Sequence, residues 1–251
     1  MFGYSEAFMN RPVIRDGVTD YICFTDDRTL KSDHWRFVYV DPEKYGPAKT
    51  AKLVKTSPHL FVSEYSSSLY VDNTVRLNGP PGEFWSHLSI QTPFVTFKHP
   101  WWDCPYMTAD KLIEVGYLTH DQIDPQIADY REKGLPANAG MFHSAVLLRM
   151  HNLPEVKRLS DDWFAEIAKY SYRDQIPLSF LVWKTGFRVG LFPGRAVDDY
   201  LVMWPDVVGH RVPRAFNDET YIRLHPDVRD SGMTPREHYL KVGADEGRQW
   251  L

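Results

Sequence analysis

The sequence predicts an α/β fold, in which strands form a sheet and helices cover it. Two apolar, β-prone runs, residues 20–27 and 69–74, end in acidic or polar side chains, as strands of open α/β sheets do beside a ligand. Segments with helical patterning follow them at 47–59 and 109–133. Strand-like and helical segments that alternate along a chain are typical of the α/β class.

A second, smaller part is expected at the C-terminal end. Residues 193–213 are rich in proline and glycine, which indicates loops, and the sequence changes character from Phe216. The sequence therefore predicts a large domain at 1–213 and a small helical module at 214–251. Because so short a module buries little surface, we expect it to dock on the main domain or on a partner.

The composition is that of an ordinary globular protein. Of the 251 residues, 43% are hydrophobic and 25% are charged. The formal charge of −4 argues against a nucleic-acid partner, since such proteins usually carry a basic face. No apolar run reaches the about 18 residues that indicate a membrane span, and no signal peptide is recognisable. Cys23 and Cys104 have no metal-ligand spacing, so we expect a reducing, cytoplasmic setting.

Two short phrases combine groups that suit a sugar. Asn138 offers a short amide, and Gly140 lets a ligand approach the main chain closely. Asp174 and Gln175 add a carboxylate and a second amide at the start of the next element. Such groups can bind the hydroxyls of a sugar, although Asp174 could instead cap a helix.

Polar side chains also follow the first predicted strand. Thr25, Asp26 and Asp27 lie where a ligand of an open α/β sheet would meet a base or a ribose. Helix capping is an equally good interpretation of these residues, since Thr and Asp accept hydrogen bonds from backbone amides.

The helical segment 47–59 carries Lys49, Lys52 and Lys55 at a spacing of three. On a helix these side chains gather on one side, where they could face a diphosphate. The alternative is a solvated lysine face, which is the commoner role of such a stripe.

A histidine and two tryptophans follow the predicted strand at 94–97. His99 precedes a proline, which holds it extended, and it could contact a site or serve the structure alone. Trp101 and Trp102 could bracket an acceptor sugar or cap the core.

Six phrases along residues 1–195 carry a family resemblance. They are Phe2-Gly3-Tyr4, Tyr21–Asp27, Ser68–Asn73, Phe97–Pro100 with Asp103–Tyr106, Leu148–Asn152 and Arg173–Gln175. In this order they resemble the TOD/MUCI-type glycosyltransferase-like family of plants and bacteria. The Asn-Ala-Gly and Asp-Gln phrases also resemble the core of GT-A glycosyltransferases, which include glycogenin.

The resemblance implies a GT-A fold and transfer of a sugar from a nucleotide-sugar donor to a glycan or other hydroxyl acceptor. It assigns expected roles to three groups of residues. The catalytic group is Asp174, Gln175 and Asn138; the donor-binding group is Thr25, Asp26, Asp27, Lys49, Lys52, Asp72 and Gly140; the acceptor or supporting group is His99, Trp102 and His143. The glycogenin-like phrases favour retention of anomeric configuration.

A divalent cation is also implied by the resemblance. GT-A enzymes commonly end the strand before Asp72 with Asp-x-Asp, whose carboxylates hold the cation against the donor phosphates. Thr74 stands in place of the second Asp here, so a weaker Mn²⁺ or Mg²⁺ site is expected. Its ligands would be Asp72 and Thr74, with His210 at the position of a late histidine ligand.

Departures from the family pattern favour other functions. The departing residues are Thr74, Trp102, Thr108 and His143. The chain also starts at the phrase that ends the family's first strand, so that strand is expected to be truncated or to begin upstream. These features favour a catalytically silent carbohydrate- or nucleotide-binding module as the alternative. A hydrolase with Asp72, His99 and Asp174 around a metal is a third hypothesis.

The last segment has a resemblance of its own. Residues 221–228 and 233–248 resemble a short helical repeat found beside bacterial surface-polysaccharide enzymes. Thr234, Pro235 and Glu237 predict a helix start within it. The resemblance implies a bacterial or phage-like source and a partner in polysaccharide assembly.

Overall fold

The computed structural model divides the chain into two compact units, Met1–Trp204 and Pro205–Leu251, and each is described by itself. The predicted boundary at 213/214 lies outside the described residues. The residues that the structure describes are 1–3, 8, 10, 13–77, 80–197, 202–203, 216–243, 246 and 248.

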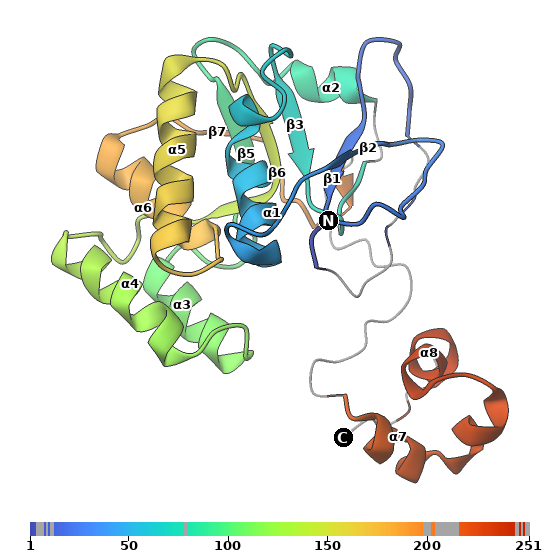
Figure 1. Cartoon of the computed structure of the whole chain (residues 1–251). Coiled ribbons are helices and arrows are strands. Elements are labelled where there is room, and N and C mark those ends of the chain that lie inside the picture. The colour runs from blue at the N-terminus through green and yellow to red at the C-terminus, as the bar shows by residue number, and fades with distance from the viewer. Residues whose placement is uncertain are drawn as a thin grey trace. The chain divides into compact units, whose positions relative to one another are not determined.

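A mixed sheet forms the centre of the first unit (Figure 1). Its strands lie in the order β3-β6-β5-β7. Their bounds are β3 Ser68–Val71, β5 Phe94–Lys98, β6 Phe142–Arg149 and β7 Gly190–Leu191. β6 runs antiparallel to both β3 and β5, whereas β5 and β7 are parallel. β6 is buried along nearly its whole length, which explains the apolar run Ala145–Leu148 within it.

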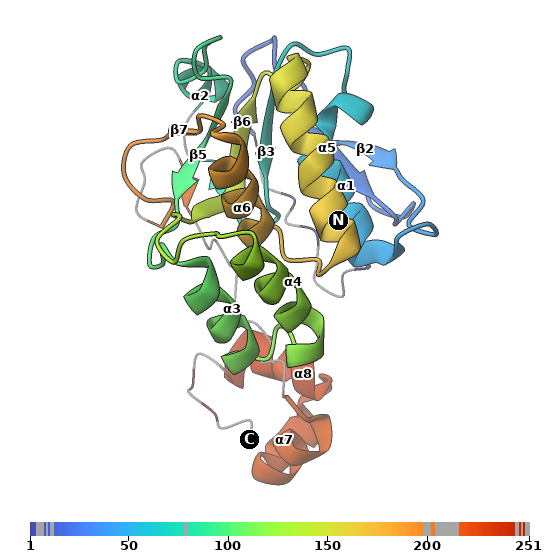
Figure 2. The same ribbon diagram turned by 90° about the vertical axis from the view of Figure 1, so that its left-hand side faces the viewer.

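The two faces of the sheet belong to two apolar clusters, because neighbouring residues of a strand point to opposite sides. Phe94 and Leu147 pack with α3, α4, α5 and α6, whereas Val95 and Val146 pack with Phe84 of α2 on the other face. The bounds are α2 Pro81–Trp85, α3 Pro105–Glu114, α4 His120–Glu132, α5 Pro154–Lys169 and α6 Gln175–Thr185. Figure 2 shows α5 and α6 in front of the sheet, with α3 and α4 next to them.

α1 (Gly46–Thr56) packs against α5 and is followed by a 3₁₀ helix (Pro58–Leu60), as the helical segment 47–59 predicts. The predicted segment 109–133 is divided into α3 and α4 by Gly116, whose φ of 69° favours glycine. Thr119 and Gln122 then form a capping box that starts α4.

Short strand pairs complete the described part of this unit. β1 (Ile22–Thr25), which lies in the strand predicted at 20–27, pairs in parallel with β2 (Arg36–Tyr39). β4 (Arg76–Leu77) pairs with β8 (Val202–Met203). The predicted loops at 193–213 lie partly outside the described residues.

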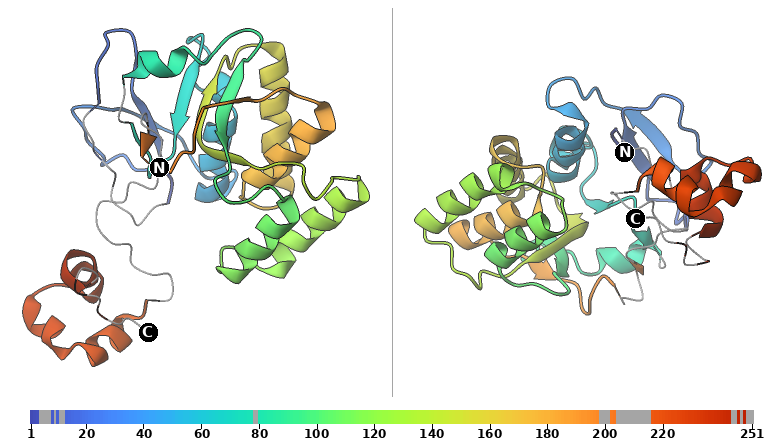
Figure 3. Two further views of the ribbon diagram at one scale, coloured as in Figure 1. Left: turned by 180° about the vertical axis from the view of Figure 1, so that it is seen from behind. Right: turned by 90° about the horizontal axis from the view of Figure 1, so that it is seen from below.

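The second unit is a set of short helices (Figure 3), and these helices pack around an aromatic cluster. They are α7 Asp218–Leu224, a 3₁₀ helix Pro226–Ser231, α8 Pro235–His238 and a π-helical turn Tyr239–Gly243. Thr234 and Glu237 form the capping box of α8, so the predicted helix start is confirmed. Helices on a mixed sheet plus a small helical module confirm the predicted fold class.

In the described part of the chain, no helix combines the length and apolar character needed to cross a bilayer.

Candidate functional site

One edge of the sheet gathers polar side chains from several segments. Since β6 is antiparallel to its neighbours, the start of β6 lies beside the ends of β3 and β5. Val71 pairs with Val146 and Lys98 with Phe142, and the amide of Asp72 donates to the carbonyl of Ala145 at 2.9 Å. This edge therefore presents the residues that follow β3 and β5 together with the first residues of β6.

A buried carboxylate lies at the centre of this edge. Asp174 directly precedes α6, and its side chain is only 5% exposed. Trp163 of α5 holds the main chain there by donating its indole N–H to the Asp174 carbonyl at 2.7 Å. The hydroxyl of Ser144, in β6, donates to Oδ2 of Asp174 at 2.5 Å.

Two lysines of α1 neutralise Asp174. Lys52 Nζ lies 2.8 Å from Oδ1, and Lys55 Nζ lies 2.7 Å from Oδ2. Residues three apart on a helix share one side, so a single helix can supply both ammonium groups. Lys55 is almost completely buried, whereas the Lys52 side chain remains 20% exposed.

Lys55 also joins Asp174 to Asp72. Its Nζ lies 3.2 Å from Oδ1 of Asp72 and 3.3 Å from the hydroxyl of Ser144. The phenol of Tyr70, two residues earlier on the same side of β3, donates to the same Asp72 oxygen at 2.8 Å. The Asp72 side chain is 33% exposed, so this carboxylate meets solvent while Asp174 does not. We call Lys52, Lys55, Asp72, Ser144 and Asp174 the lysine–aspartate cluster.

The lysines determine the charge state of Asp174. Burial alone would raise the pKa of this carboxyl, but the charges of Lys52 and Lys55 and their hydrogen bonds lower it well below its usual range. Asp174 is therefore ionised at neutral pH. With two lysines and two aspartates, the cluster carries almost no net charge.

A buried arginine holds the end of α1 that carries Lys55. Arg149, the last residue of β6, donates through Nη1 to the carbonyls of Lys55 at 2.7 Å and Thr56 at 3.4 Å. Complete burial lowers the pKa of Arg149 to about 9. Next along the chain, His151 contacts Ser68 and the carbonyl of Val62. The phrase Leu148–Asn152 thus anchors the segment that connects α1 to β3.

Two histidines and a tryptophan lie at the β5 side of the edge. The His99 ring stacks on Trp102 with ring centroids 4.9 Å apart, and its Nδ1 accepts from the Trp102 amide at 3.1 Å. Neutral His99 therefore carries its proton on Nε2. The ring of His143 lies 6.0 Å from that of His99. Burial lowers the pKa of each histidine to about 4, so both are neutral at pH 7.

A family model for the TOD1/MUCI70 glycosyltransferase-like domain matches residues 19–202. The chain belongs to this family. Two glycosyltransferase structures are also similar, at 11% and 12% identity. The apo structure of the WbbM bifunctional glycosyltransferase has a TM-score of 0.40, with 64% of this chain and 29% of that chain covered. Apo mouse xyloside xylosyltransferase 1 has a TM-score of 0.34, with coverage of 61% and 60%. This chain thus spans less than two thirds of the length of either of these two glycosyltransferases. A search of curated proteins found no match to the chain.

Asp72, at the end of β3, and Asp174 of the family's Asp-Gln phrase thus lie in one cluster, whereas, within the described part of the chain, Asn138 and Gln175, which were expected to act with Asp174, do not join it. Lys55 contacts both aspartates, and Lys52 pairs with Asp174, while donor binding by Lys52 stays a prediction. Lys49 does not share this role, because its Nζ donates to the carbonyl of Ala168 at the end of α5. Helical spacing alone could not separate Lys49 from Lys52.

Other predicted residues lie apart from the cluster. Asn138 is exposed in the turn before β6, and Gly140, at a φ of 85°, donates its amide to the Asp103 carbonyl. Gln175 begins α6, and Thr74 lies in the turn after Asp72. Among the described residues, no hydrogen bond or ion pair joins the side chains of Asn138, Gln175 or Thr74 to Asp72 or Asp174.

The residues after β1 form a turn of their own. Thr25 is buried, and its hydroxyl accepts from the amide of Asp27 at 3.0 Å. Asp26 accepts from the amide of Gly3 at 2.9 Å, and Asp27 accepts from the amide of Thr29 at 2.8 Å. The helix-capping interpretation is wrong, because residues 26–30 form a bend and a turn rather than a helix.

The candidate cation ligands are only partly described. His210 lies outside the described residues. Within them, no three His, Cys, Asp or Glu side chains come together as a metal site would require. An ion held by one carboxylate, a hydroxyl and the phosphates of a substrate is still compatible with Asp72 and Thr74, because Mg²⁺ is often bound in this way.

Sequence reasoning missed Ser144, Tyr70 and Arg149. Tyr70 could have been found, since it precedes Asp72 by two residues and strand side chains two apart share a face. Ser144 and Arg149 gave no local signal, since they lie within an apolar strand and contact residues far away in the sequence.

Proposed function

We propose that the first unit transfers a sugar from a nucleotide-sugar donor to a hydroxyl group of a glycan or another acceptor. Membership of a glycosyltransferase-like family supports the reaction class. The observation that carries the proposal is an ionised Asp174 held by two lysines beside Asp72, at the edge of the sheet. Fixed charges at such a site can stabilise charge that develops during transfer.

Each member of the lysine–aspartate cluster has a role in this proposal. The carboxylate of Asp174 supplies negative charge toward the sugar carbon, which becomes positive as the leaving group departs. Lys52, the more exposed lysine, faces the departing diphosphate. Lys55 keeps Asp174 ionised and holds Asp72 near it.

A divalent cation is part of the proposal, because the lysines are already neutralised by the aspartates. Asp72, whose side chain is 33% exposed, would hold Mn²⁺ or Mg²⁺ together with Thr74 and the donor phosphates. The ion would supply positive charge to the leaving diphosphate. Asp72 would keep one oxygen on Lys55 and Tyr70 and turn the other to the ion.

The reacting hydroxyl of the acceptor would lie on the β5 side of the cluster. Nε2–H of neutral His99 can donate to an acceptor oxygen, and the half-buried Trp102 ring can cover one face of a sugar.

The test is release of nucleoside diphosphate from a panel of UDP-, GDP-, ADP- and TDP-sugars, with Mn²⁺ or with EDTA. Asp174→Ala is expected to lose at least about 100-fold in rate, as removal of one electrostatic group typically does. Asp162→Asn, an exposed carboxylate on α5, is the matched control and should retain the wild-type rate. Turnover that survives in Asp174→Ala would refute the assigned role.

A silent binding module is the second candidate, and one observation favours it. Both oxygens of Asp174 are already engaged, and its side chain is nearly inaccessible, as expected of a structural ion pair. Binding of a nucleoside diphosphate without release from any donor would support this candidate over the transferase.

The cellular setting is also proposed from resemblance alone. We place the protein in the cytoplasm of a bacterium, in surface-polysaccharide synthesis, with the C-terminal unit contacting an assembly partner. A pull-down with the Pro205–Leu251 unit as bait is the corresponding test, and recovery of no glycan-synthesis protein would contradict it.

A further inference from the structure

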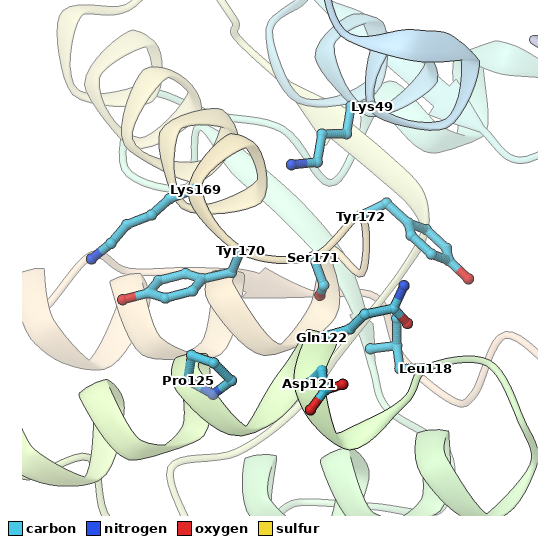
Figure 4. A pocket seen from close by; sticks show the side chains of 9 residues that line it. All are labelled: Lys49, Leu118, Asp121, Gln122, Pro125, Lys169, Tyr170, Ser171 and Tyr172. Atoms are coloured by element: carbon cyan, nitrogen blue, oxygen red, sulfur yellow. The ribbon is translucent and has the colours of Figure 1, made fainter.

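A pocket of about 360 Å³ lies beside the lysine–aspartate cluster, and no role above uses it. It is formed by α1, by the start of α4 and by the segment that joins α5 to α6. Figure 4 shows the side chains that line it, which include Lys49, Asp121, Gln122, Tyr170, Ser171 and Tyr172. Its volume falls at the small end of the range for ligand pockets, about 300–1,000 Å³.

Two segments of the chain connect this pocket to the cluster. Lys49 lines the pocket, and Lys52, about one helical turn later on α1, binds Asp174. Tyr172 lines the pocket only two residues before Asp174, so their Cα atoms lie no more than about 7 Å apart. A ligand that reaches from the cluster into the pocket therefore has a short path along α1 and the segment 170–174.

The lining suits a ligand with many hydroxyl groups. Asp121 and Gln122 are exposed at the start of α4 and offer a carboxylate and an amide. Tyr170 and Tyr172 lie on either side of Ser171 (Figure 4); the Tyr172 ring adds aromatic surface, whereas the Tyr170 ring carries the Lys169 ammonium over it, 4.5 Å from its centroid. Aromatic rings pack on the C–H face of a sugar ring, while polar groups at the edge bind its hydroxyls.

The walls of the pocket are fixed by contacts outside it. The hydroxyl of Tyr172 donates to the Tyr117 carbonyl at 3.0 Å, and the Lys49 ammonium donates to the Ala168 carbonyl at 2.7 Å. Gln122 is held by the capping box that starts α4. A pocket with walls held in this way can bind without a large ordering cost.

We infer that this pocket binds one sugar unit of an oligosaccharide, next to the unit that reacts at the lysine–aspartate cluster. The inference rests on the proposed glycosyl transfer and narrows its acceptor to a glycan chain of two or more units. Lys49 then belongs to the acceptor side rather than to the diphosphate of the donor.

The experiment measures binding of the full chain to an array of immobilised neutral and acidic oligosaccharides and to the matching monosaccharides. Wild type should bind at least one oligosaccharide and bind its monosaccharide more weakly. Tyr172→Ala should weaken this binding about tenfold through loss of the ring. Tyr172→Phe is the matched control, since it retains the ring and loses only the bond to Tyr117. Asp121→Ala, at an exposed position, is a second variant and should also bind more weakly.

Three results would overturn the inference: a wild type that binds no oligosaccharide, binding that Tyr172→Ala and Asp121→Ala leave unchanged, or equal losses in Tyr172→Ala and Tyr172→Phe. Thermal unfolding of each variant shows whether it is folded. Binding of UDP, GDP, ADP or TDP to wild type reports on the proposed function separately. A chain that binds one of these nucleotides but no oligosaccharide refutes the pocket and leaves the transferase proposal standing.

Discussion

Replacement of Lys55 by methionine tests the central ion pairs most directly. The substitution keeps most of the side-chain volume and removes the ammonium, which lies 2.7 Å from Asp174 and 3.2 Å from Asp72. Removing one partner of a buried pair typically costs about 3–5 kcal/mol, because the other charge stays buried. Lys52 still neutralises Asp174 in the variant, and the partly exposed Asp72 adds at most about 1 kcal/mol. We therefore expect the free energy of unfolding to fall by about 3 kcal/mol, near the lower end of that range.

The measurement is urea unfolding followed by circular dichroism at pH 7. Lys49→Met, on the same helix, is the control and should lose only about 1 kcal/mol, since it breaks one hydrogen bond to a carbonyl. The double variant Lys55→Met/Asp174→Asn should recover part of the loss, because the charges that then lack a partner, those of Lys52 and Asp72, are partly exposed rather than buried. A loss below about 1 kcal/mol in Lys55→Met, or strict additivity in the double variant, would refute the proposed ion-pair arrangement.

Three other perturbations have expected outcomes. Acidification from pH 7 to pH 5 should lower the free energy of unfolding. Burial lowers the pKa of His143 in the folded chain to about 4, so the unfolded chain binds the proton at a higher pH than the folded chain does. His143→Asn should reduce the difference in the free energy of unfolding between pH 7 and pH 5, measured by urea titration at each pH. An unchanged difference would contradict this prediction. The contribution of Asp174 should persist to lower pH, because its folded pKa lies well below the usual range. Arg149→Met should lower the free energy of unfolding in urea by about 1–3 kcal/mol, because the Lys55 carbonyl loses its hydrogen-bond donor. An unchanged free energy would show that water replaces the guanidinium. Thr234→Ala should destabilise the C-terminal unit by about 1 kcal/mol through loss of the capping box, measured by hydrogen exchange across 235–243, and wild-type protection there would argue against the cap.

Local features of the chain were predictable because their causes are local. Strand ends, the helix at 47–59 and the cap at Thr234 depend on side chains a few residues apart. The same holds for the lysine spacing on α1, which puts Lys52 and Lys55 on one side. The family phrases added Asp72 and Asp174 as site candidates, and these two do lie in one cluster.

The sequence by itself determined the α/β class, the small helical module and the choice of Asp72 and Asp174 as site candidates. Only the tertiary structure decided which lysine neutralises which acid, and it placed Lys49 at the end of α5 instead. It also brought in Ser144 and Arg149, through contacts 30 and 94 residues away along the chain. The physical reason is that the antiparallel register of β6 and the packing of α1 on α5 bring distant segments together, and no local pattern of residues records that geometry.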